Sequence, residues 1–213
     1  MLMNKKGVLV VISGFAGSGK GTITKELLNR YSNYRFSVSA TTRSPRPGEV
    51  DGRDYIFVTR EKFESMIENN ELLEHAEYVG NYYGTPKSYV EKMLDEGKDV
   101  ILEIEYLGAF NVKKEFPKAI LCFITPPSAE EVYNRLKGRG TETEEVIFKR
   151  LHRGQEEVQI MDKYDYIFVN DDLESAINSI HMAVQCTKNF AAFNNKDLIS
   201  RLSVQFDELL KNN

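Results

Sequence analysis

One stretch decides the fold of this chain, and it reads Gly14-Phe15-Ala16-Gly17-Ser18-Gly19-Lys20-Gly21-Thr22. An apolar run at 8–12 precedes it and predicts a short buried strand. After it, Ile23, Leu27 and Leu28 are spaced like one face of a helix. A strand, a glycine-rich turn and the start of a helix form the setting in which the motif G-x-x-x-x-G-K binds phosphate.

The glycines let the backbone of this loop curl, so that several N–H groups converge at the positive end of the helix dipole. Lys20 is expected to reach the β and γ phosphates of a nucleotide as a point charge. Gly21 follows it where Ser or Thr is usual, and a hydroxyl comes one place later at Thr22. The alternative is a glycine-rich surface turn, which the flanking strand and helix patterns disfavour.

Length and composition indicate one large soluble domain. The 213 residues carry 41% hydrophobic residues and a formal charge of −4, which argues against a general nucleic-acid binder. No stretch reaches transmembrane length, and the N-terminus lacks a signal-peptide layout. We therefore expect a cytoplasmic protein with neither nucleic acid nor membrane as a partner. Cys122 and Cys186 lie in different segments and are expected to be reduced thiols.

Strand and helix patterns alternate along most of the chain, which predicts a parallel sheet with helices on both faces. The expected strands are 8–12, 36–39, 100–104, 119–124 and 166–169. The expected helices after the first are 88–96, 107–116, 128–137, one opened by the capping box at 141–144, and one from Asp171 or Asp172 to about 187. In such a sheet, a ligand lies beyond the carboxyl ends of the strands, where the glycine-rich loop, Glu103 and Glu105 are expected to meet.

Residues 37–86 interrupt this alternation as an inserted subdomain would. Its first loop holds Arg43 and Arg46, which repel each other unless an anion such as phosphate sits between them; a solvated basic loop is the alternative. A helix capped by Thr59 and an extended segment at 72–79 follow. Residues 81–86 are expected to form a turn whose tyrosines cover the core or reach a ligand.

The C-terminal extension, residues 191–213, is expected to contain a further helix. Leu198, Leu202, Phe206 and Leu209 are spaced as an apolar stripe on one of its faces. Such a stripe needs a surface to cover, either on this chain or on a second copy, and a homo-oligomer would meet that need.

Several runs of residues together resemble the signature of guanylate kinases, in order over about residues 7 to 187. These runs are 37–39, 41–49, 80–84, 138–145 and 169–172. The resemblance implies a P-loop kinase core (1–36, 87–127 and 158–190), a GMP-binding subdomain (37–86) and a mobile lid (128–157). It implies that ATP and GMP are the substrates, with Mg²⁺, and that dGMP is also accepted.

The resemblance also implies roles for individual residues. The loop residues Gly14, Phe15, Ala16, Gly17, Ser18, Gly19, Lys20, Gly21 and Thr22 would bind ATP. Ser39, Glu74 and Thr85 would read the guanine, and Arg43, Arg46, Tyr55 and Tyr83 would hold the GMP phosphate. Arg135, Arg139 and Arg150 would close over the ATP phosphates as lid residues and, with Lys20 and Arg43, form the catalytic set. Glu103 would also contact GMP, and Glu103 and Glu105 would hold the metal through water.

Two departures from the family pattern stand out. Phe15-Ala16 replaces the usual Pro-Ser of the loop. The family's Asp-x-Asp-x-Gln-Gly becomes Glu103-Ile104-Glu105-Tyr106-Leu107-Gly108, so that both acids are one methylene longer and the glutamine is lost.

The chemistry of the base supports a guanine reader. Guanine presents two adjacent donors that one carboxylate at Glu74 can accept, whereas adenine presents an acceptor there. No catalytic base is required, because the acceptor is an anionic phosphate and phosphoryl transfer depends on alignment and charge neutralisation. A protein-binding module without catalysis and a kinase for another acceptor are the alternatives. Lys20 and the lid arginines speak against the first, and Glu74 with Ser39 against the second.

Overall fold

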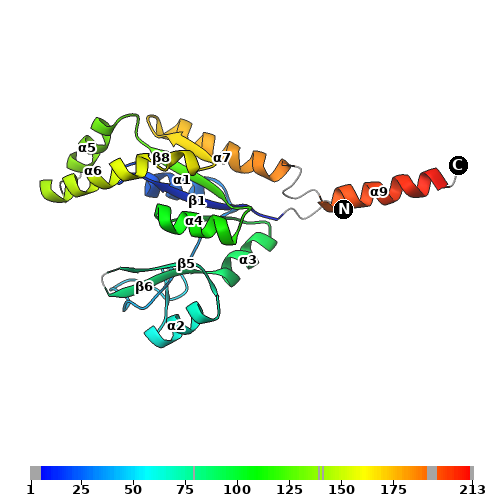
Figure 1. Ribbon diagram of the computed structural model, residues 1–213, viewed down its shortest axis with the longest axis horizontal. Coiled ribbons are helices and arrows are strands. Elements are labelled where there is room, and N and C mark those ends of the chain that lie inside the picture. The colour runs from blue at the N-terminus through cyan, green and yellow to red at the C-terminus, as the bar shows by residue number, and fades with distance from the viewer. Residues whose placement is uncertain (1–5, 79, 139, 141, 191–195, 212–213) are drawn as a thin grey trace.

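The computed structural model describes residues 6–78, 80–138, 140, 142–190 and 196–211. Its centre is a five-stranded sheet in the order β2-β7-β1-β8-β9 (Figure 1). These strands are β2 (Tyr34–Phe36), β7 (Asp99–Glu103), β1 (Leu9–Gly14), β8 (Ile120–Thr125) and β9 (Tyr166–Val169). Every neighbouring pair is parallel, which confirms the predicted α/β fold with a five-stranded parallel sheet.

Helices cover both faces of this sheet. The side chains of the central strand β1 point alternately into the two cores between the sheet and these helices. Val10 and Ile12 point to the core formed with α1 (Lys20–Arg30) and α7 (Leu173–Asn189). Leu9 and Val11 point to the opposite core. The helices of that second side are α3 (Lys87–Asp95), α4 (Tyr106–Glu115), α5 (Ala129–Gly138) and α6 (Glu144–Val158). A central strand buried on both faces reads as a continuous apolar run, as this sequence does.

A second, four-stranded sheet in the order β4-β3-β6-β5 lies below the first in Figure 1, with α4 between them. Its elements are β3 (Ala40–Thr41), β4 (Ile56–Phe57), α2 (Arg60–Glu68), β5 (Leu72–Tyr78) and β6 (Asn81–Pro86). Ala40, Phe63, Met66 and Leu72 form a small core of its own. Thr59 Oγ1 accepts a hydrogen bond from Lys62 N at 3.2 Å, so the predicted cap of α2 is confirmed.

Two predictions in this region are wrong. The strand expected at 36–39 ends at Phe36, and the chain then crosses to the second sheet, with Ser37 N donating to Ile101 O at 2.9 Å. Residues 81–86 form β6 instead of a turn. The strand β6 pairs with β3 on one side and β5 on the other, and this tertiary pairing overrides the local turn signals of Gly84 and Pro86.

The cap of α5 agrees with prediction, whereas α6 is capped by Thr143, two residues after the first residue of the predicted capping box, and Thr141 lies outside the described residues. Glu131 N donates to Ser128 Oγ at 3.1 Å at the start of α5, and Val146 N donates to Thr143 Oγ1 at 3.5 Å at the start of α6. A short 3₁₀ helix, η1 (Met161–Lys163), precedes β9. Both cysteines are free thiols, with Cys122 buried in β8.

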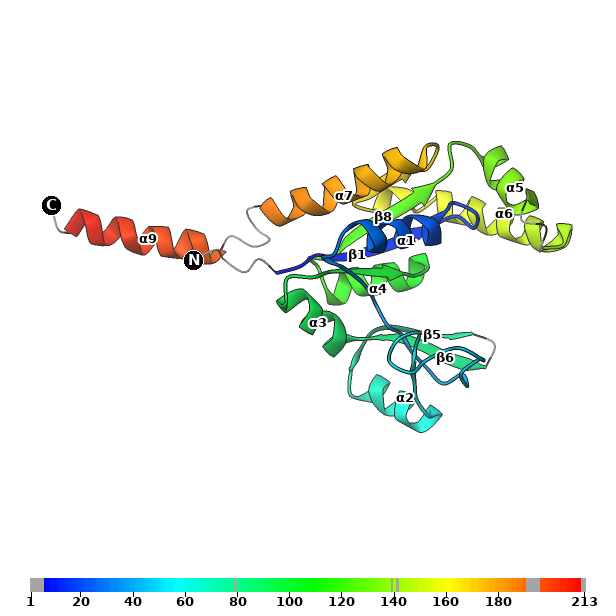
Figure 2. The same ribbon diagram turned by 180° about the vertical axis from the view of Figure 1, so that it is seen from behind.

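The predicted C-terminal helix is α9 (Lys196–Lys211), which extends away from both sheets beyond the end of α7 (Figures 1 and 2). Among the described residues, no helix is long and apolar enough to span a membrane.

One buried carboxylate joins the amino-terminal end of β7, an inner strand of the main sheet, to α7. Asp99 is fully buried, and its Oδ1 accepts a hydrogen bond from Val8 N at 2.9 Å. Its Oδ2 accepts from the side-chain amide of Asn33, and from Lys188 Nζ at 2.6 Å. These three donors belong to the start of β1, the loop before β2 and the last turn of α7. A single side chain therefore joins three segments that are distant in sequence.

We expect Asp99→Asn to lower the free energy of unfolding by about 2–4 kcal/mol, because the new amide group would face donors and leave a buried ammonium without its carboxylate. Urea unfolding at neutral pH measures this change. The control is Asp95→Asn, whose carboxylate pairs with Lys6 at 2.7 Å on the surface and should contribute less than about 1 kcal/mol. Equal effects of the two substitutions would contradict the proposed importance of Asp99.

Candidate nucleotide-binding site

The glycine-rich loop between β1 and α1 has the backbone that its sequence demands. Gly17 and Gly19 have φ values of 82° and 90°, in the left-handed region that side chains disfavour. At Gly19 there is a second requirement, because a Cβ there would collide with the side-chain amide of Asn170. That amide nitrogen donates to Ser18 O at 2.8 Å and so fastens the loop to the end of β9. The loop therefore directs its backbone N–H groups to one hollow at the start of α1.

Lys20, the first residue of α1, folds back over this loop. Its Nζ donates to Gly14 O at 2.7 Å and to Phe15 O at 3.0 Å. The same side chain lines a cavity of about 130 Å³ at the carboxyl ends of β1 and β7, together with Glu103, Glu105 and Glu157. The structure thus brings the glycine-rich loop and the two predicted acids to one edge of the sheet.

The two predicted acids differ in their surroundings. Glu103 ends β7, and its Oε2 lies 3.4 Å from the hydroxyl of Thr24 on α1. Glu105 precedes α4, and its carboxylate forms an ion pair with Arg153 of α6. No group of three or more His, Cys, Asp or Glu side chains suited to a metal occurs among the described residues. Mg²⁺ in phosphoryl-transfer sites is commonly held by one or two carboxylates, phosphates and water, a requirement that Glu103 fits.

The second sheet contributes a half-buried carboxylate. Glu74 in β5 accepts a hydrogen bond from Thr85 Oγ1 in β6 at 2.8 Å, and Thr85 is fully buried. Burial raises the pKa of Glu74, and the bonds from Thr85 act in the opposite direction. A Cβ at Gly108 would lie 3.4 Å from Glu74 Oε2, so α4 approaches this carboxylate closely. Ser39 is half-buried on the segment that crosses between the sheets.

The arginine loop of the second sheet holds an internal anion. Arg43 donates two hydrogen bonds to Glu49, at 2.9 and 3.0 Å, and Arg46 N donates to the same carboxylate at 2.7 Å. This pairing lowers the pKa of Glu49. The Arg43 guanidinium also lies 5.3 Å from the ring centroid of Tyr55, which meets the Tyr83 ring edge-to-face at 6.1 Å. The four residues predicted to bind phosphate, Arg43, Arg46, Tyr55 and Tyr83, are therefore close together, and the Glu49 carboxylate bonds the first two of them.

The predicted arginines of α5 and α6 have separate partners. Arg135 donates to Asn170 O at 3.0 Å and to Glu131 Oε1 at 2.7 Å, and its Cβ lies near Gly17 of the loop. Arg150 pairs with Glu142 at 2.9 Å. Arg139 lies outside the described residues. The structure thus places Arg135 against the glycine-rich loop, whereas Arg150 contacts the segment just before α6.

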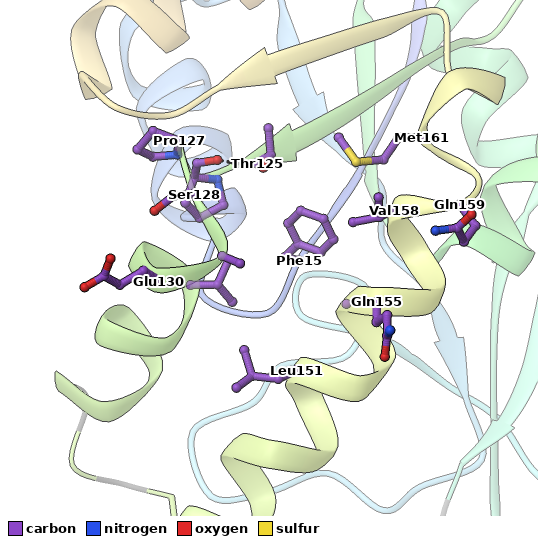
Figure 3. A pocket seen from close by; sticks show the side chains of 14 residues that line it. Phe15, Thr125, Pro127, Ser128, Glu130, Leu151, Gln155, Val158, Gln159 and Met161 are labelled. Atoms are coloured by element: carbon purple, nitrogen blue, oxygen red, sulfur yellow. Dashed lines mark hydrogen bonds between the residues drawn. The ribbon is translucent and has the colours of Figure 1, made fainter.

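An apolar cavity of about 700 Å³ lies between α5, α6 and the glycine-rich loop (Figure 3). The ring of Phe15 points into it, with Leu151, Val158 and Met161 around it. Phe15 also meets the Phe123 ring edge-to-face at 5.0 Å. Phe15 therefore points away from the charged hollow, so that its contribution to a phosphate site comes from its backbone.

Three residues around the glycine-rich loop and the cavity beside it had no role assigned from the sequence. Asn170 stood inside a recognised run, and only the fold shows that its amide holds the loop. Arg153 and Glu157 are four residues apart on α6, a spacing that is usually a solvated surface pair. Nothing local indicates that Glu157 is 8% exposed and lines the cavity with Lys20.

Comparison with known proteins covers most of this chain. The guanylate kinase family model matches residues 6–187. A guanylate kinase of Halalkalibacterium halodurans is 55% identical over 180 residues, 84% of this chain and 88% of that protein. A guanylate kinase of Lactococcus lactis is 51% identical over 183 residues, 86% of this chain and 89% of that protein. The crystal structure of guanylate kinase from Anaplasma phagocytophilum superposes with a TM-score of 0.71 at 33% identity, covering 95% of this chain and 96% of that chain.

We expect Lys20→Ala to lower turnover with ATP by about a hundredfold or more, because the loop loses the one cation that can follow a transferring phosphoryl group. The fold should be unaffected, since Lys20 is only half-buried and belongs to neither hydrophobic core of the main sheet. The measurements are kcat and the midpoint of thermal unfolding, with Lys25→Ala on the exposed face of α1 as the control. Near-normal turnover in folded Lys20→Ala protein would rule out this role.

Proposed function

We infer the roles of individual residues from the premise that this chain belongs to the guanylate kinase family and catalyses phosphoryl transfer from ATP to GMP. The observation that carries these roles is the hydrogen bond between the half-buried Glu74 and the buried Thr85, on a sheet separate from the glycine-rich loop. The Glu74–Thr85 pair can read a base while the glycine-rich loop holds a triphosphate. The two substrates would then meet at the edge where β1 and β7 end.

In this proposal the guanine is read by Glu74, Thr85 and Ser39. The Glu74 carboxylate accepts both donors of the guanine edge, and a hydroxyl donates to the guanine oxygen. The hydrogen bond from Thr85 fixes the carboxylate before the base arrives. Glu103 would contact the sugar or phosphate of GMP from the end of β7.

The GMP phosphate would be bound by Arg43, Arg46, Tyr55 and Tyr83. The internal contact with Glu49 supports this role, because the guanidinium of Arg43 and the amide of Arg46 already converge on one carboxylate. Two oxygens of a tetrahedral phosphate can accept the same pair of guanidinium hydrogen bonds, and the group carries more negative charge. Glu49 holds Arg43 in place and leaves the remaining donors of the loop to the ligand.

The triphosphate of ATP would be held by the loop residues 14–22 and by Arg135, with Arg139 and Arg150 as further lid cations. Lys20 would leave the carbonyls of Gly14 and Phe15 to follow the transferred group. Mg²⁺, when bound, would neutralise charge on the β and γ phosphates, and Glu103 is the residue placed to hold it through water. Glu105, the second acid expected from the sequence, is already paired with Arg153.

We also propose that residues 37–86 and 128–157 move toward the core when both substrates bind. Arginines on these two segments must converge on one phosphate chain, and water must be excluded from the transferring group. We place this protein in the cytoplasm, where ATP and GMP are available.

The extension beyond the family match would serve assembly instead of catalysis. On α9, Leu202, Phe206 and Leu209 of the predicted stripe are between 41% and 61% exposed, and Leu198 is half-buried. A second copy of the chain fits this stripe.

Base selection tests the role of Glu74. We expect the protein to use GMP and dGMP about a hundredfold or more better than AMP, because a buried carboxylate that faces the adenine acceptor is left unpaired. Glu74→Gln keeps the shape but replaces one acceptor with a donor, so kcat/KM for GMP should fall sharply while the KM for ATP changes little. Steady-state kinetics with GMP and AMP measure both effects.

The matched control for this test is Glu77→Gln, on the same strand but exposed. It should leave kcat/KM for GMP unchanged. If Glu74→Gln behaves like the control, or if the natural protein prefers AMP, Glu74 does not read the base.

Removal of residues 194–213 tests the assembly role of α9. We expect truncation to reduce the number of chains in each particle, as measured by sedimentation or light scattering, because the apolar stripe that joins two copies is gone. The KM for GMP should stay within about twofold, since the missing helix lies outside the site. An unchanged number of chains in each particle would contradict self-association through α9. A large selective rise in the KM for GMP would show that the extension belongs to the site.

A further inference from the structure

The helix α6 presents three charged residues along one of its faces. Arg150, Arg153 and Glu157 are spaced by three and four residues, which places them in a row along the helix. The outer end of this row carries Arg150 and the inner end carries Glu157, whose side chain is 10% exposed. Arg153 lies between them, one turn from each.

Arg153 bonds two carboxylates from different parts of the fold. Its guanidinium forms an ion pair with Glu105, which lies between β7 and α4, and its Nε donates to Glu157 Oε1 at 3.3 Å. Glu105 and Glu157 both line the 130 Å³ cavity that contains Lys20. The base of α6 is therefore attached to the catalytic edge of the sheet through one side chain.

The charges around Lys20 give this attachment a second consequence. Burial raises the pKa of Glu157, whereas the positive charges of Arg153 and Lys20 lower it. Glu157 is thus a buried carboxylate that interacts with both cations. Without Arg153, Lys20 would be the one of these two cations left beside Glu157. The negative charge of Glu157 would then attract Lys20 more strongly and hold it away from a phosphate.

We propose that Arg153 is a positioning residue for phosphoryl transfer, which it serves by pairing with Glu105 and Glu157. These two contacts hold the base of α6 at the catalytic edge, so that Arg150, one turn further along the same face, is directed toward the ATP phosphates. They also leave Lys20 available to the transferred group. The proposal rests on the roles of Lys20 and Arg150 given above, and it assigns Glu105 to the support of α6 instead of to the metal.

The test compares Arg153→Ala, Arg153→Lys and Glu105→Gln with the unaltered protein. We expect Arg153→Ala to lower kcat by about tenfold to a hundredfold, because small misplacements of catalytic groups have effects of this size. The KM for GMP should stay within about twofold, since the base-reading residues lie on the other sheet. Arg153→Lys should recover part of kcat, because it restores the charge without the two-sided geometry of the guanidinium.

A double-mutant cycle tests the pairing itself. Glu105→Gln should lower kcat as Arg153→Ala does, and the double variant should be little worse than either single one, because both remove the same contact. The control is Lys149→Ala on the same helix, whose ammonium pairs with Glu145 at 2.7 Å on the exposed face. It should leave kcat and both KM values unchanged.

Three results would overturn the proposal. One is a lower unfolding midpoint for Arg153→Ala with kcat unchanged, which would make its contacts purely structural. Another is a strong rise in the Mg²⁺ concentration that Glu105→Gln needs for half-maximal rate, without such a rise for Arg153→Ala, which would make Glu105 a metal residue. The third is full additivity of the two substitutions. In each case an unaltered protein that turns over GMP normally would leave the guanylate kinase assignment intact.

Discussion

The left-handed turn at Gly19, pressed against the side chain of Asn170, is the constraint on which this structure depends. The glycine conformation turns the chain from β1 into α1, and the Asn170 amide fastens the turn to the end of β9. The carbonyl of the same asparagine accepts a hydrogen bond from Arg135 of α5. The phosphate loop, the last strand of the sheet and the first lid helix therefore converge on one residue. A side chain at Gly19 would disturb all three together.

Around this point the enzyme keeps a balance of charge. Lys20, Glu103, Glu105 and Glu157 line a small cavity, and Arg153 pairs with Glu105 and Glu157 beside it. An unpaired charge at the buried Glu157 would be costly. On the other side of the loop, the Phe15 ring lies in an apolar cavity with no ionisable partner in its ring contacts. The loop thus separates a charged side, which contains Lys20, from an apolar side, where α6 rests on the core.

The sequence predicted best the features that depend on neighbours along the chain. Thr59 and Ser128 cap the helices that they were expected to cap, because capping is satisfied within one turn. It predicted worst the features that depend on a partner strand. Residues 81–86 carry turn signals, yet β6 exists because β3 and β5 supply hydrogen bonds on both sides. The same limit applies to the site, where the role of Arg153 depends on Glu105 and Glu157 from two separate elements.

The sequence by itself determined the glycine-rich loop, the alternation of strands and helices, the inserted segment and the resemblance to guanylate kinases. These are short-range patterns, and motif spacing and periodicity record them directly. Only the tertiary structure decided that Glu49 accepts hydrogen bonds from Arg43 and Arg46, that Glu74 is bonded to the buried Thr85, and that Arg153 connects α6 to the catalytic edge. The physical reason is that burial and charge pairing are set by contacts between segments, which the order of residues does not specify.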